Sequence, residues 1–175
     1  MKNIIAFILL LNIANTFGQK IFTDTKDPFT NIRTVSTTLD PLYRVGFTNI
    51  LQVQTSVTIQ NDSITSCNFA LIVPAVSYQI EKIDSSFKDV CLFKDESGNI
   101  YLGKVTSSVS TAVLGSTYNL FTCVFTKEDF LKLMNAKITD IKITTTGGKG
   151  GLFPIDKKRQ DNIANQIKTL LKFFK

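Results

Sequence analysis

The sequence predicts an α+β protein: an antiparallel sheet of about five to seven strands, with one short helix and a longer C-terminal helix packed on it. Two observations lead to this prediction. Apolar and polar residues alternate through residues 51–60, as in a strand with one buried face. After Thr126 the apolar spacing changes to the helical period in two segments.

The strands are read from apolar runs separated by turn residues. In LQVQTSVTIQ (51–60) apolar Leu51, Val53, Val57 and Ile59 alternate with polar residues, and CNFALIVPAVSYQI (67–80) reads as a more fully buried strand that Pro74 limits or bends. VCLFK and IYLGKV flank DESGN, which predicts a hairpin because Gly98 and Asn99 tolerate positive φ. TYNLFTCVFT (117–126) is another strand. The preceding TSSVSTAVLGST suits either a loop or an edge strand.

Two helices are expected near the C-terminus. Thr126 is placed to cap a short helix, with Glu128 and Asp129 favourable for its dipole. The second helix is expected to follow Asp156 as its cap. Inward-facing residues are predicted to be Phe130, Leu131 and Met134 in the first helix, and Ile163, Ile167, Leu170, Leu171 and Phe174 in the second.

The segment TTTGGKGG (144–151) has the composition of a phosphate-binding loop. A Walker loop needs a Ser or Thr directly after its lysine, and here Gly150 follows Lys149. The next residues, GLFPI, read as a short strand that pairs back on DIKITT. We therefore predict that the glycines form a hairpin turn.

The N-terminus has the pattern of a cleavable secretory signal. Lys2 precedes an apolar run from Ile4 to about Leu11, and small residues lie near Gly18. The run is too short to span a bilayer as a helix. We expect residues 1–18 to be a signal peptide and residues 19–175 to form a single α+β domain that is periplasmic or secreted.

The absence of histidine excludes Ser-His-Asp and Cys-His catalysis and histidine-ligated zinc. Cys67, Cys91 and Cys123 lie in apolar surroundings, which favours buried thiols, although one disulfide among them stays open. SSFK (85–88) matches the short S-x-x-K pattern, but its companion motifs are missing. We expect no catalytic residue, metal or cofactor.

Positive charge is concentrated in the last third of the chain. Residues 127–175 contain eleven Lys or Arg against five Asp or Glu, whereas residues 19–126 are nearly balanced. Such an excess favours an anionic surface or a protein partner, while export disfavours nucleic acid as a partner. The candidate contact residues are Lys149, Lys157, Lys158, Lys168, Lys172 and Lys175.

The C-terminal third resembles small exported proteins of Bacteroidota with no assigned function. The resemblance is carried by FTKEDFLKLMNAKITDIKITTTGG followed by PIDKKRQDNIANQIKTLL. It implies a periplasmic or secreted setting and no particular activity.

These observations together predict an exported, non-enzymatic binding or interaction domain that is not an integral membrane protein after signal cleavage. One alternative is a carrier of lipid or small apolar ligands with a cavity between sheet and C-terminal helix. Another is a hydrolase that uses carboxylates alone, which requires acidic residues to converge in a cleft.

Overall fold

The fold was analysed in a computed structural model, which describes residues 20–46, 48–74, 89–113, 116–146 and 150–173. The predicted signal peptide lies outside the described residues. The elements are β1 (Ile21–Lys26), β2 (Arg33–Thr37), β3 (Asp40–Val45), β4 (Thr48–Gln60), β5 (Ser63–Pro74), β6 (Val90–Asp95), β7 (Ile100–Val113), β8 (Ser116–Phe125), α2 (Lys127–Leu133), β9 (Ile138–Thr144), β10 (Gly150–Pro154), the 3-10 helix η1 (Lys157–Arg159) and α3 (Asn162–Lys172).

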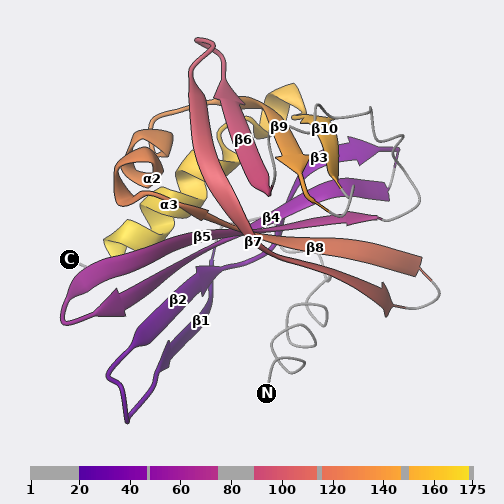
Figure 1. Cartoon of the computed structure of the whole chain (residues 1–175). Helices are drawn as coiled ribbons and strands as arrows, with labels where there is room; N and C mark the ends of the chain where they lie inside the picture. Colours follow the sequence, from indigo (N-terminus) through magenta and orange to yellow (C-terminus); the bar gives the residue numbers. More distant parts are fainter. Residues whose placement is uncertain (1–19, 47, 75–88, 114–115, 147–149, 174–175) are drawn as a thin grey trace.

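The described strands form one ten-stranded antiparallel sheet (Figure 1). Its order is β1-β2-β4-β5-β8-β7-β6-β9-β10, and β3 pairs with β4 beside β2. The expectation of five to seven strands is therefore wrong. Residues 21–45 contribute three short strands whose weak alternation hid them, and the open segment TSSVSTAVLGST belongs mostly to the long β7–β8 hairpin.

The sheet curls until the chain leaving β10 reaches β3. The amide of Asp156 donates to the carbonyl of Leu42 at 3.0 Å. The guanidinium of Arg159 donates to the carbonyl of Pro41 at 3.1 Å, and the side-chain amide of Asn162 donates to the same carbonyl at 3.3 Å. These bonds join two parts of the sheet that lie far apart in its strand order.

The two helices lie against the buried face of the sheet. Helix α3 contacts β4 and β2, and α2 contacts β5, β7 and α3. Thr126 caps α2 as predicted, because its hydroxyl accepts from the amide of Asp129 at 3.1 Å. The buried positions of α2 are Phe130 and Leu133, so the inward orientation predicted for Leu131 is wrong.

The single long C-terminal helix that was expected after Asp156 is also wrong. The carboxylate of Asp156 pairs with Arg159 at 3.1 Å instead of capping a helix. The chain forms the short η1 and a turn before α3 begins at Asn162. Ile163, Ile167 and Leu170 are buried, whereas Phe174 lies outside the described residues.

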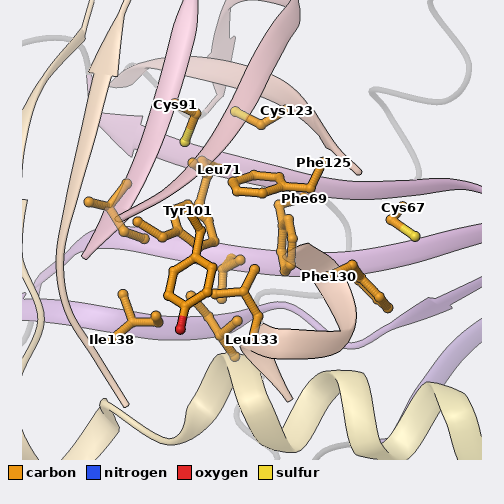
Figure 2. Close-up of a cluster of buried hydrophobic side chains, with 14 of the residues drawn as sticks. Cys67, Phe69, Leu71, Cys91, Tyr101, Cys123, Phe125, Phe130, Leu133 and Ile138 are labelled. Carbon is orange, nitrogen blue, oxygen red and sulfur yellow. The ribbon is translucent and has the colours of Figure 1, made fainter. Parts of the chain in front are cut away.

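Aromatic side chains fill the space between sheet and helices (Figure 2). The ring of Phe69 lies 5.1 Å from those of Phe93 and Phe125 and 5.7 Å from that of Phe130, centre to centre. Gly103 on β7 leaves room for this cluster, since a Cβ there would clash with the Phe125 ring. The packing of the phenylalanine cluster therefore requires glycine at position 103.

Candidate functional site

Three of four neighbouring strands, β7, β6 and β10, carry apolar residues on both faces, and the fourth, β9, has Asp140 and Lys142 on its outer face. On β7, Tyr101 and Val105 point into the core, while Ile100 and Leu102 are 63% and 54% exposed. Sheets with one solvated face normally place polar residues at such outward positions. This departure marks the outer face of the four strands as a candidate interaction surface.

The register of the strands brings the outward residues together. Leu102 lies opposite Leu92, Leu92 opposite Lys142, and Lys142 opposite Leu152. Leu152 is also 54% exposed. One row of side chains therefore crosses four strands, with a lysine between two leucines. The hydrocarbon stem of a lysine can continue an apolar surface while its ammonium reaches solvent.

A second row runs beside the first. Ile100 lies opposite Lys94, Lys94 opposite Asp140, and Asp140 opposite Pro154. We define the outer patch as the exposed or half-buried outward residues of these strands. They are Val90, Leu92, Lys94, Ile100, Leu102, Lys104, Asp140, Lys142, Leu152 and Pro154. Three lysines against one aspartate give the patch a net charge of +2.

The four described lysines among those predicted from the sequence do not belong to this patch. Lys157 and Lys158 are exposed on η1, and Lys168 and Lys172 are exposed on α3. Lys149 and Lys175 lie outside the described residues. The four described lysines therefore form two pairs, one on η1 and one on α3. The lysines that the structure brings together on the outer patch are Lys94, Lys104 and Lys142.

All three thiols are free and buried. Burial raises the pKa of Cys67 to about 11. Burial also raises the pKa of Cys91, and the neighbouring Cys123 adds to this effect. Figure 2 shows both side chains in the core. A thiol whose pKa is raised holds little thiolate at neutral pH. Their environment is that of core residues and not of nucleophiles.

The buried carboxylates bond to groups of their own chain. Asp95 accepts from the amides of Ser97 and Asn99 and from the hydroxyl of Tyr101, each at 2.9 Å. Its burial opposes the charged form, but these bonds and that from the Asn99 side chain outweigh burial, so its pKa lies below the ordinary value. Asp95 thereby orders the β6–β7 turn.

Of the two short motifs singled out in the sequence, the structure describes only part of one. SSFK lies outside the described residues. The predicted pairing of GLFPI with DIKITT is confirmed, because Gly151 lies opposite Ile143 and Phe153 opposite Ile141. The segment joining β9 and β10 is therefore a hairpin connection. Among the described residues, no group of three or more His, Cys, Asp or Glu is placed to hold a metal ion.

Comparison with known proteins returned no matching family model, no matching curated protein and no matching solved structure. Within the described part of the chain, no helix combines the length and apolar character needed to cross a membrane.

Sequence reasoning missed the outer patch, although one signal of it was visible. In IYLGKV, apolar residues occupy both parities of the strand: Ile100 and Leu102 on one face, Tyr101 and Val105 on the other. An apolar residue at both parities indicates that both faces of a strand are covered or bind something. The lysines of β6 and β9 lie beside these residues only because the strands pair, so the sequence did not reveal that they share one surface.

Proposed function

We propose that this chain is an exported, non-enzymatic binding protein that attaches reversibly to an anionic membrane surface through the outer patch. The observation that carries the proposal is the continuous row of Leu102, Leu92, Lys142 and Leu152 across four strands, with both end leucines more than half exposed. The patch offers aliphatic groups and positive charge together. The boundary between headgroups and acyl chains of an anionic bilayer offers phosphates and apolar chains side by side.

The composition of the patch favours lipid over a protein partner. Protein interfaces are enriched in Tyr, Trp, Phe and Arg and depleted in Lys. The outer patch contains three lysines, no aromatic residue and no arginine. Leucine and isoleucine side chains can enter the acyl boundary, while lysines extend to the phosphates. Pairing of the patch with that of a second copy is disfavoured because the two positively charged surfaces repel each other.

The expected binding energy is sufficient for reversible attachment. Each lysine close to an anionic membrane surface contributes about 1 kcal/mol. Fully burying a leucine or isoleucine side chain contributes about 1.5 to 3 kcal/mol, and Ile100, Leu102 and Leu152 have roughly half of that left to gain. Such a sum places the patch in the range of weak peripheral association, not of permanent anchoring.

The interior gives less support to the two alternatives. Packed phenylalanine rings with centres 4.8 to 5.7 Å apart occupy the space between the sheet and α2. Ile163, Ile167 and Leu170 of α3 are buried where a carrier would need a cavity. A carboxylate hydrolase would need acidic groups free to exchange protons with a substrate. Asp95 and Asp156 instead bond to donors of their own chain.

Co-sedimentation with vesicles tests the membrane proposal. The mature protein is mixed with phosphatidylcholine vesicles that contain or lack phosphatidylglycerol. We expect binding only to the anionic vesicles, weakened by salt. Two variants test the patch. One replaces its exposed leucines (Leu102→Ser with Leu152→Ser), and the other replaces its lysines (Lys94→Gln, Lys104→Gln and Lys142→Gln combined). Each variant should bind at least tenfold more weakly than the parent and melt at a similar temperature.

The helix lysines provide the matched control. Lys168→Gln with Lys172→Gln removes charge from α3 and should leave vesicle binding nearly unchanged. If that variant loses binding while the patch variants keep it, the contact lies on the helix, as the charge distribution of the sequence suggested. Absence of binding by the parent protein to anionic vesicles refutes the membrane proposal.

Export is proposed from the N-terminal sequence and has its own test. Signal cleavage after Gly18 would give a mature protein that starts at Gln19. Intact mass of the protein recovered from the native host outside the cytoplasm decides this. A mass that includes residues 1–18 would contradict cleavage.

A further inference from the structure

The far half of β7 is an open strand edge. β6 pairs with residues 100–104 of β7, and just beyond them the amide of Val105 donates to the carbonyl of Asp89 at 2.8 Å. After a register shift at Val105 and Ser107, residues 107–113 pair with β8 on one side, and the structure describes no strand on the other. Figure 1 shows this end of the hairpin extending away from the helices. Such an edge presents backbone amides and carbonyls to any strand that can reach them.

The open edge of β7 lacks the charges and prolines that usually prevent pairing with another chain. The two ends of the strand order have them: Asp24 and Lys26 are exposed on β1, and Pro154 lies in β10. Residues 106–113 read TSSVSTAV, without a charge or a proline. All residues from Thr106 to Ser110 are exposed. The far half of β7 is therefore both accessible and unprotected.

The sequence of this edge is complementary to itself. An antiparallel pairing centred on Val109 places this valine opposite its own copy, Ser108 opposite Ser110, and Ser107 opposite Thr111. Each pair joins small side chains of the same kind, and hydroxyl pairs and β-branched pairs stabilise a sheet across strands. Val109 is 46% exposed, so the pairing also removes apolar surface from water.

We infer that β7 pairs with β7 of a second copy of this chain, which joins the two sheets across a two-fold axis at Val109. A two-fold interface requires one segment to fit its own reverse. The near-palindrome of residues 107–111 meets this requirement, and its neutrality means that no like charges meet. An unrelated strand would need no such symmetry. Because one strand edge buries little surface, the dimer is weak and forms as the protein concentration rises.

The joined sheet also changes how the outer patch is presented. The two-fold axis of an antiparallel strand pair is perpendicular to the sheet, so the same face of both copies points to the same side. Both outer patches then face one membrane, and two linked weak contacts hold more tightly than one. This consequence rests on the proposed function, whereas the dimer itself is tested without vesicles.

Sedimentation velocity across a range of protein concentrations tests the dimer. We expect the parent to shift from monomer to dimer as its concentration rises. Val109→Lys and Val109→Asp each place like charges at the axis, so each should weaken the dimer at least tenfold. An equimolar mixture of these two variants should restore dimers, because opposite charges then meet. Thr65→Lys, exposed on β5, is the control and should change self-association less than twofold.

Cross-linking with a short bismaleimide locates the axis. Val109→Cys should give covalent dimers, whereas Thr106→Cys should not, because antiparallel pairing carries position 106 away from its own copy. The parent, whose thiols are buried, shows the background. Equal yields at positions 106 and 109 would overturn the pairing.

The inference is also overturned by a parent that stays monomeric at every concentration, by dimers that Val109→Lys and Val109→Asp leave intact, or by a mixture of the two that stays monomeric. Cross-links from position 109 to a different protein in the native host, with a monomeric parent, would assign the edge to another chain instead. A dimer without vesicle binding, or vesicle binding by a monomer, shows which of the two proposals has failed.

Discussion

The hydroxyl of Thr55 on β4 donates a 2.6 Å hydrogen bond to the side-chain oxygen of Gln166 on α3. Both residues are completely buried, and 111 positions separate them. The side-chain nitrogen of Gln166 donates to the carboxylate of Asp40 at 2.9 Å and to the carbonyls of Val53 and Thr38 at 3.2 and 3.3 Å. This network fixes where α3 lies along the sheet.

Replacement of Gln166 should destabilise the fold strongly. Gln166→Leu leaves Asp40 and Thr55 without this partner in the interior, which we expect to cost about 3 kcal/mol. Thr55→Val should cost about 1 kcal/mol, and the two changes together less than their sum because they remove one shared bond. Urea denaturation measures this, with exposed Asn165→Ala as the control. Equal midpoints for Gln166→Leu and Asn165→Ala would contradict a role for the network.

Gly103→Ala should be destabilising by about 1 to 3 kcal/mol because the added methyl group overpacks the core. The Phe125 ring that it meets cannot easily move, since its centre lies 4.8 Å from that of Phe93 and 5.1 Å from that of Phe69. Thermal melting of Gly103→Ala with and without Phe125→Leu tests this. The smaller side chain should recover part of the loss caused by Gly103→Ala, and additive losses would argue against the steric explanation.

Asp95 should make stability depend on pH in the acidic range. Its pKa in the folded protein lies below the ordinary value of 3.8, so its charged form favours folding. The contribution of the charged carboxylate to the free energy of unfolding is complete at pH values above the ordinary pKa. It is lost as the pH falls through the lower pKa of the folded protein. Asp95→Asn should therefore reduce stability at neutral pH, and the gap to the parent should narrow below about pH 4.

Urea unfolding at neutral pH and near pH 3 measures this gap. Glu96→Gln, next to Asp95 but exposed, is the control and should change stability little at either pH. A gap between Asp95→Asn and the parent that stays constant with pH would show that the carboxylate charge is not responsible.

The buried and exposed faces of α3 should respond differently to truncation. Leu170 and Ile167 are fully buried, so either change to alanine should cost about 2 to 5 kcal/mol. Lys168→Ala and Lys172→Ala should change stability by less than about 0.5 kcal/mol, since both side chains are exposed. Melting curves of the four variants compare the faces. A lysine variant that melts as early as Leu170→Ala would mean that α3 packs differently.

The sequence alone predicted those features of the fold that depend on residues close together in the chain. The alternation of residues 51–60 correctly placed Leu51, Val53, Val57 and Ile59 in the core, but Gln54 on the face expected to be solvated is buried as well. Thr126 identified the start of α2, because a hydroxyl before a helix satisfies an amide that otherwise has no partner. The β9–β10 hairpin followed from its glycines. Each of these signals acts within a few residues.

The tertiary structure decided everything that depends on strand pairing. Residues 21–45 become strands because β4 and one another supply their hydrogen bonds, which no local pattern reveals. Asp156 looked like a helix cap but pairs with Arg159, which the carbonyl of Pro41 also holds. The outer patch likewise exists only in register: Leu102, Lys142 and Leu152 are separated in the chain, and hydrogen bonding between four strands makes them one surface.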